Sequence, residues 1–388
     1  MLTKKILFKN FSFKRSNKKI LILFQKLIKE DNEILISMGN FYKESYLKKK
    51  VLKFRKFKRF NLVGMGGSVL GTRSIYSFLN HKIKKIFSFK DNLIDYKQDL
   101  KFNKKDTLNI IVSKSGNTLE TIINTNILIN KKQNNIFITE NKKSYLMNLA
   151  EKLKSEIIYH NNYIGGRYSV LSEVGMVPAQ LMGLNTNKFR RFNYLVKNKK
   201  FINALVSNVS KILHLANNKK CNSIILNYDE KSLEFFQWYQ QLVAESLGKK
   251  GKGVLPIISQ MPKDNHSLMQ FYLDGFKKNF YTFHFVEESS SRKIVNNTIL
   301  NSHSYLKNKS INEIKRSQFN ASRKVFEQKN IPHRSFIIKK RDEESLGELF
   351  TFFILETILL GKAMNINPYD QPAVELIKKE TSQILKRA

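Results

Sequence analysis

Short apolar runs alternate with helical segments through most of this chain, and this pattern occurs twice. In the first set, the runs that we predict as strands are 61–63, 85–89, 108–112, 135–138 and 156–159. A polar stretch rich in Asn and Lys at 185–200 interrupts the pattern, and further predicted strands follow at 223–227, 254–258, 280–286 and 335–338. Strands that alternate with helices favour parallel sheets with helices on their faces. The sequence therefore predicts an α/β fold with two such sheets in tandem.

The length of 388 residues is sufficient for two domains. We predict an N-terminal helical segment at 1–54, a first domain at 55–190 and a second domain at 191–388. The second domain is expected to end in helices that are interrupted at 365–368. No apolar run is long enough to span a bilayer, and the apolar stretch at 20–24 is too short for a signal peptide. We expect a cytoplasmic protein that has no membrane association.

The formal net charge of +38 would ordinarily indicate a nucleic acid or an anionic membrane as partner. The lysines, however, are spread along the whole chain and occur together with abundant Asn, Ile, Phe and Tyr. This mixture is typical of AT-biased coding, so we favour a compositional origin and expect no nucleic acid partner. The charge would still attract an anionic substrate. Cys221 is the single cysteine, which excludes an intrachain disulfide, and the seven histidines lack metal-binding spacing, so we expect no metal.

The predicted strand at 108–112 is followed by Ser-Lys-Ser-Gly-Asn-Thr at 113–118, where a helical pattern begins. Ser113, Ser115 and Thr118 provide hydroxyls, and Lys114 provides an ammonium group. The N–H groups at a helix N-terminus favour an anion. A P-loop ending in Gly-Lys-Ser/Thr is absent, so the turn indicates a small phosphorylated metabolite rather than a nucleoside triphosphate. The alternative interpretation is an ordinary turn between a strand and a helix.

Two further glycine-rich segments have the composition of binding turns. Gly-Met-Gly-Gly-Ser at 64–68 follows the first predicted strand, and its glycines allow a ligand to approach the backbone. Val69 stands where a dinucleotide-binding motif requires a third glycine. In Gly-Gly-Arg-Tyr-Ser at 165–169, Arg167 supplies a fixed cation that suits an oxyanion, although an arginine in such a position is more often part of a surface ion pair.

Two residues in the second half, Glu245 and His266, have side chains suited to proton transfer, and a third, Lys378, is by itself typical of a surface residue. Glu245 lies near the end of a predicted amphipathic helix, close to its buried side, where a carboxylate can act as a base. His266 opens another helical segment, and a histidine can exchange protons near neutral pH. Lys378 lies on the last predicted helix, which begins near Pro372. Taken singly, each of these residues also has an ordinary structural interpretation.

Taken together and in this order, the segments resemble the glucose-6-phosphate isomerase family. The resemblance runs from about Asn61 to Lys378 and rests on these segments together with Gln-Gln-Leu-Val-Ala-Glu-Ser-Leu-Gly-Lys at 240–249, Asp-Asn-His-Ser at 264–267 and Asn-Pro-Tyr-Asp-Gln-Pro at 367–372. It implies two tandem sugar isomerase (SIS) domains, each a parallel sheet flanked by helices. It also implies interconversion of glucose 6-phosphate and fructose 6-phosphate without a cofactor.

The resemblance implies a role for each matching residue. Glu245 would be the base that moves a proton between carbon 2 and carbon 1, and Arg167 would stabilise the cis-enediol intermediate. His266 and Lys378 would assist opening of the sugar ring, with the histidine entering from the neighbouring subunit of a homodimer. The residues that would bind the sugar phosphate are Gly67, Ser68, Ser113, Lys114, Ser115, Thr118, Gln241 and Gln371.

The chain differs from the family pattern at Ala373 and Ile377, where the family has glycine, and at Asn265, where many members have glutamine. Two alternatives to a strict glucose 6-phosphate isomerase remain at this point. One is an isomerase that also accepts mannose 6-phosphate, which differs in the configuration of one hydroxyl group. The other is a non-catalytic SIS-type sugar-phosphate sensor, which would need the turn at 113–118 but not the four candidate catalytic side chains.

Overall fold

The computed structural model describes residues 2–14, 18–95, 106–129, 133–288, 290–295 and 298–387. The strands are β1 (Ile6–Lys9), β2 (Arg59–Val63), β3 (Ile86–Lys90), β4 (Thr107–Val112), β5 (Asn134–Thr139), β6 (Glu156–Tyr159), β7 (Asn222–Asn227), β8 (Leu255–Gln260), β9 (Asn279–Val286) and β10 (His333–Ile338). The helices are α1 (Lys18–Leu27), α2 (Glu33–Ser37), α3 (Lys48–Leu52), α4 (Leu70–Phe78), α5 (Leu119–Leu128), α6 (Tyr145–Lys152), α7 (Glu173–Leu181), α8 (Phe192–Leu195), α9 (Lys199–Asn217), α10 (Leu233–Leu247), α11 (Met269–Asp274), α12 (Ile311–Gln328), α13 (Glu343–Ala363) and α14 (Pro372–Arg387). Short 3-10 helices include η2 (Gly66–Ser68), η6 (Gly166–Leu171) and η9 (Lys263–His266).

The strands form two sheets, and the two sheets share one winding pattern. The first has the order β3-β2-β4-β5-β6 with all neighbours parallel, and the second has the order β1-β10-β9-β7-β8. From β2 in the first sheet and from β7 in the second, the chain adds a neighbour on one side and then continues on the other side. Adjacent strands β2 and β4, and likewise β7 and β9, therefore flank a topological switch point, where ligands bind in open α/β sheets. The predicted α/β fold with two tandem sheets flanked by helices is confirmed.

One strand was not anticipated by the sequence. Strand β1 lies in the N-terminal segment, which we predicted to be helical, and pairs antiparallel with β10 at the edge of the second sheet. Ile6 is fully buried, and the strand is only four residues long between basic and polar neighbours. An apolar run of that length carries little periodicity, so only its pairing with β10, more than 300 residues away, identifies it as a strand.

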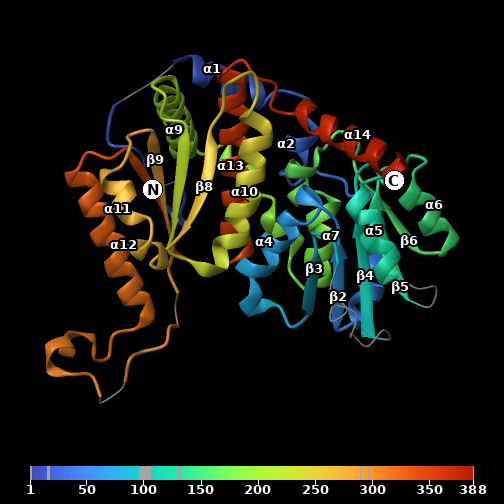
Figure 1. Cartoon of the computed structure of the whole chain (residues 1–388), viewed down its shortest axis with the longest axis horizontal. Helices are drawn as coiled ribbons and strands as arrows, with labels where there is room; N and C mark the ends of the chain where they lie inside the picture. Colours follow the sequence, from blue (N-terminus) through green and yellow to red (C-terminus); the bar gives the residue numbers. More distant parts are fainter. Residues whose placement is uncertain are drawn as a thin grey trace.

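The central core lies between the two sheets (Figure 1). Helix α10 contacts β8 of the second sheet, α13 and α4, so it joins the two halves of the molecule. A separate apolar cluster that includes Phe283, Phe319 and Phe326 covers the outer face of the second sheet beneath α12. Another that includes Ile111, Phe137 and Leu146 covers the outer face of the first sheet beneath α6. Side chains on α10 therefore face the junction between the halves.

The last two helices differ strongly in burial. Almost all residues of α13 are buried, whereas α14 has no buried residue and extends along the first half of the molecule (Figure 1). Within the described residues, no helix combines the length and the apolar character that crossing a bilayer requires.

Candidate active site

The turn at 113–118 follows β4 and leads into α5, as predicted. Thr118 is the residue before the helix, and its hydroxyl lies 2.9 Å from that of the buried Ser113. Gly116 has a φ of +65°, and a Cβ there would come within 2.1 Å of Ser144 Oγ. The exposed Ser115 accepts a hydrogen bond from the Asn117 N–H at 3.2 Å. A glycine is therefore required at 116, and the turn presents hydroxyls beside a helix N-terminus, where an anion is favoured.

Lys114 extends from the same turn into a cleft. Its ammonium donates to the Asn162 carbonyl at 2.8 Å and lies 3.5 Å from the Glu140 carboxylate. The cleft has a volume of about 620 Å³, and its walls include Lys114, Tyr163, Gly166, Tyr369 and Gln371. The cleft is large enough for a hexose phosphate, and it lies between the first sheet and the turn at 367–371.

The glycine-rich turn after β2 packs directly against the segment that carries Arg167. A Cβ at Gly67 would lie 2.2 Å from the carbonyl carbon of Gly166, so only glycine allows the two backbones to approach this closely. Gly66 has a φ of +52° and lies against the side-chain amide of Gln241. Ser68 ends η2 beside it. Gly67, Ser68, Arg167 and Gln241 are therefore brought into one region.

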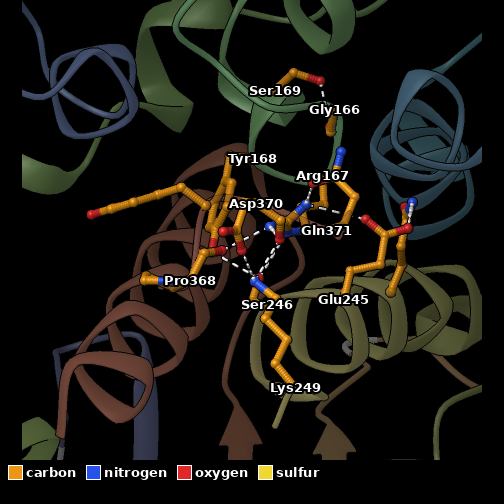
Figure 2. A network of polar contacts seen from close by, with 12 residues as sticks. Gly166, Arg167, Tyr168, Ser169, Glu245, Ser246, Lys249, Pro368, Asp370 and Gln371 are labelled. Atoms are coloured by element: carbon orange, nitrogen blue, oxygen red, sulfur yellow. Dashed lines mark hydrogen bonds and ion pairs between the residues drawn. The ribbon is translucent and has the colours of Figure 1, made fainter. Parts of the chain in front are cut away.

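Arg167 is the centre of a buried network (Figure 2). Its side chain is 2% exposed, and all five of its N–H donors have acceptors. Nε donates to Ser246 at 2.8 Å, and Nη1 donates to the Glu245 carboxylate at 3.2 Å and to Gln371 Oε1 at 2.7 Å. Nη2 donates to the carbonyls of Pro368 and Asp370 at 2.7 and 3.0 Å. The arginine thus fixes the turn at 367–371, and it is not the surface residue that its immediate sequence favours.

Glu245 lies on α10 next to this cation. One carboxylate oxygen accepts from Gln241 Nε2 at 2.8 Å, and the other accepts from Arg167. The side chain keeps 31% of its surface exposed and lines a second cavity, of about 540 Å³, together with Lys249, Asp370 and Gln371. A carboxylate that is oriented by two donors and still reaches a cavity can accept a proton from a bound molecule.

His266 and Lys378 are not brought into this network. His266 is exposed at the end of η9, and among the described residues it has no hydrogen bond or ion pair with any other candidate residue. Lys378 has a side chain that is 62% exposed and pairs with Glu375 of the same helix at 2.7 Å. The described chain therefore assembles the base and the cation, whereas the two residues expected to open the sugar ring lie outside the network.

Sequence reasoning missed several residues that shape the site. Lys249 stands at the end of a quoted motif but received no role, although its ammonium contacts the turn at 367–371. Asn32 of the N-terminal segment donates to the Tyr369 hydroxyl at 3.0 Å. No local signal marks these partners, which lie more than 100 residues apart. The described part of the chain contains no cluster of three or more His, Cys, Asp or Glu side chains positioned to hold a metal ion.

Comparisons with known proteins identify one family. The Phosphoglucose isomerase family model matches residues 11–257. The chain is 31% identical to the glucose-6-phosphate isomerase of Methanocaldococcus jannaschii over 94% of this chain and 92% of the relative. It is 30% identical to the glucose-6-phosphate isomerase of Mycoplasmopsis pulmonis over 94% of this chain and 88% of the relative.

Two solved structures share the fold. A hypothetical protein from Thermus thermophilus aligns with a TM-score of 0.84 at 22% identity and covers 95% of this chain and 94% of its own. A glucose-6-phosphate isomerase from Chlamydia trachomatis aligns with a TM-score of 0.73 at 17% identity, covering 99% of this chain and 89% of its own.

Proposed function

The chain belongs to the phosphoglucose isomerase family and interconverts glucose 6-phosphate and fructose 6-phosphate, and we propose how its own residues carry out this reaction. Glu245 is the base that removes the proton from carbon 2 of the aldose and delivers it to carbon 1. Arg167 stabilises the negative charge that develops on the enediol oxygens. The observation that carries this proposal is the Glu245 carboxylate, which is fixed by Gln241 and Arg167 and still reaches a cavity.

The physical argument is that moving a proton from a weakly acidic carbon requires a positioned base and a cation for the resulting oxyanion. A positioned general base contributes about 10²–10⁴-fold in rate, and a preorganised donor at the oxyanion contributes about 10²–10³-fold. In this chain the two groups are 3.2 Å apart and are held by different elements, η6 and α10. A substrate in the cavity that Glu245 lines would therefore meet the base with the cation directly behind its carboxylate.

The substrate phosphate is assigned to the turn at 113–118. Ser113, Lys114, Ser115 and Thr118 supply hydroxyl, ammonium and backbone donors at the start of α5. Four further residues are proposed to contact the sugar or its phosphate, namely Gly67, Ser68, Gln241 and Gln371. Because the phosphate remains unchanged in the reaction, its binding energy can be used to orient the reacting carbons.

Ring opening is assigned to His266 and Lys378, and we propose that the enzyme works as a homodimer in which His266 of one subunit serves the site of the other. The exposed position of His266 supports this proposal, as does the exposure of the apolar residues Leu376 and Ile377 on α14, at 68% and 70%. We also propose a cytoplasmic enzyme that needs no cofactor, with the division into 1–54, 55–190 and 191–388.

The proposal is tested by a coupled assay with fructose 6-phosphate as substrate. Wild-type protein is expected to form glucose 6-phosphate, and Glu245→Gln to lower kcat by about 10²–10⁴-fold, because the amide cannot accept the proton. Glu230→Gln is the matched control, since the Glu230 side chain is 81% exposed.

Full activity of Glu245→Gln would remove Glu245 as the base. Absence of product with wild-type protein would contradict the isomerase function and favour the sensor. Mannose 6-phosphate in the same assay tests the specificity at carbon 2.

The homodimer is tested by mixing two inactive variants, Glu245→Gln and His266→Asn, under conditions where subunits exchange. If His266 acts across the interface, each mixed dimer contains one intact site and one site with both changes. Random mixing of equal amounts then restores about one quarter of the wild-type activity, because half of the dimers are mixed. A mixture that stays as inactive as its components would show that both residues come from the same chain. Refolding each variant alone is the control.

A further inference from the structure

Lys249 lies two residues beyond the end of α10 and is almost fully buried, with 12% of its side chain exposed. Its ammonium donates to three oxygens of one turn, namely the carbonyls of Asn367 and Asp370 and the Asp370 carboxylate, the last at 2.6 Å. A lysine ammonium has three N–H donors, so all of them are directed at this turn. The contact joins segments about 120 residues apart in the chain.

Arg167 also donates hydrogen bonds to this turn (Figure 2). The Asp370 carbonyl accepts from both cations, and the Pro368 carbonyl accepts from Arg167 and from the Tyr168 hydroxyl. Gln371, the next residue, accepts from Arg167 through its side chain. The location of the turn, and with it the position of the guanidinium next to Glu245, therefore depends on both cations.

The local backbone explains why a lysine at this position reaches the turn. Gly248 ends α10, and a Cβ there would lie 2.7 Å from the Ala244 carbonyl, so glycine lets the chain bend sharply. Gly251 and Gly253 have φ values of +66° and +136°, which allow the chain to double back. The N–H of Lys249 then donates to the Lys252 carbonyl at 3.2 Å, which closes the loop.

We infer that Lys249 is a positioning residue for the isomerisation: it holds the turn at 367–371 so that Arg167 and Gln371 keep their places beside Glu245. This inference rests on the proposed function of Arg167 and Glu245. Without the ammonium, two backbone carbonyls and a carboxylate lose a donor, and the turn can shift relative to α10. The turn at 113–118 lies on the first sheet, and among the described residues no hydrogen bond or ion pair joins it to Lys249, so we expect this part of the phosphate site to be retained.

The test compares Lys249→Met with Lys252→Met. Lys252 lies in the same loop, and its ammonium donates to the Met364 carbonyl at 3.1 Å, outside the turn, so both variants lose one charge from one loop. Lys249→Met is expected to lower kcat by about 10–100-fold, because a displacement of about 1 Å in a catalytic group costs about 10²-fold. KM for fructose 6-phosphate and the inhibition constant of inorganic phosphate are expected to rise by less than kcat falls, because the turn at 113–118 is kept and Gln371 alone among the proposed phosphate contacts is displaced.

Lys249→Arg retains a cation with several donors and is expected to recover most of the activity, while Lys249→Gln should lie between the arginine and methionine variants. If Lys249→Met fails to fold, the arginine and glutamine variants test the inference by themselves. Unchanged kcat in Lys249→Met, or a rise in KM with constant kcat, would overturn the inference. So would a loss in Lys249→Arg as large as in Lys249→Met. An inactive wild-type protein would instead contradict the proposed function, so the two failures are distinguishable.

Discussion

The two sheets have the same strand order around their switch points, but the two crevices there have been used differently. Between β2 and β4 the first sheet carries glycine and hydroxyl-rich turns, with Lys114 lining a cleft of about 620 Å³. At the equivalent place in the second sheet, Arg341 follows β10 and donates to Asp229 beyond β7, at 2.7 Å, and to Glu288 beyond β9, at 2.6 Å. In the first crevice an ammonium and hydroxyls line an open cleft, whereas the second crevice is filled by the chain's own arginine and carboxylates.

The charges within the second crevice are mutually satisfied. Arg341 is 4% exposed, and Asp229 also accepts from the Ser232 hydroxyl, which lies 3.1 Å from His284 Nε2. Burial alone raises the pKa of Asp229, but the Arg341 guanidinium and the Ser232 hydroxyl lower it below its ordinary value. Burial lowers the pKa of His284 to about 4, so this ring is neutral near pH 7. The same strand order can therefore support an open cleft in one half and a buried ion-pair network in the other.

Arg341→Met removes the central cation of the second crevice, and we expect the largest effect on stability from this variant. Removing one partner of a buried ion pair costs about 3–5 kcal/mol, because a carboxylate is left buried without its cation. We expect the free energy of unfolding to fall by this amount in denaturant titration. The folded fraction should keep a kcat within about twofold of wild type, since Arg341 contacts none of the candidate catalytic residues.

Arg316→Met provides the matched control for this loss. Arg316 pairs with Glu287, next to Glu288, at 2.6 Å, but both side chains are more than one third exposed. Exposed pairs contribute about 0–1 kcal/mol, so this variant should be nearly as stable as wild type. Equal losses in the two arginine variants would contradict the view that the second crevice is a buried structural centre.

The sequence predicted the sheets better than it predicted the site, for physical reasons. Strands such as β4 and β6 are recognisable because apolar runs and turn residues are local signals, and β1 escaped because its pairing is not local. Arg167 and Glu245 were candidates from their own segments, but only the family resemblance gave them roles in one site, because taken singly each also has an ordinary structural interpretation. Lys249, Asn32 and Arg341 received no role because their partners lie far away in the chain and only folding brings them together.

The exposure of Lys378 illustrates a further limit of sequence. Its helical position was predicted, and α14 begins at Pro372 as expected. Residue patterns, however, do not state where a whole helix packs. No described residue of α14 is buried, and the Lys378 ammonium pairs with Glu375 of the same helix. The contacts that orient Lys378 therefore lie within its own helix and not at the site.

Lys114→Met should weaken the first crevice and give a smaller effect with the opposite signature. The Lys114 side chain is 33% exposed, and within the described chain its ammonium has two partners, which leaves one of its three donors for a phosphate oxygen. A hydrogen bond to a charged group contributes about 1.5–3 kcal/mol, which predicts a rise in KM of about 10–100-fold. kcat should change less than KM, because Glu245 and Arg167 are untouched. The free energy of unfolding should fall by less than in Arg341→Met, because the Lys114 side chain is 33% exposed and that of Arg341 is 4% exposed. Lys143→Met, which removes an exposed lysine a short distance along the chain, controls for the lost charge. If Lys114→Met instead lowered stability as much as Arg341→Met and left KM unchanged, both crevices would be structural, and the phosphate would have to bind elsewhere.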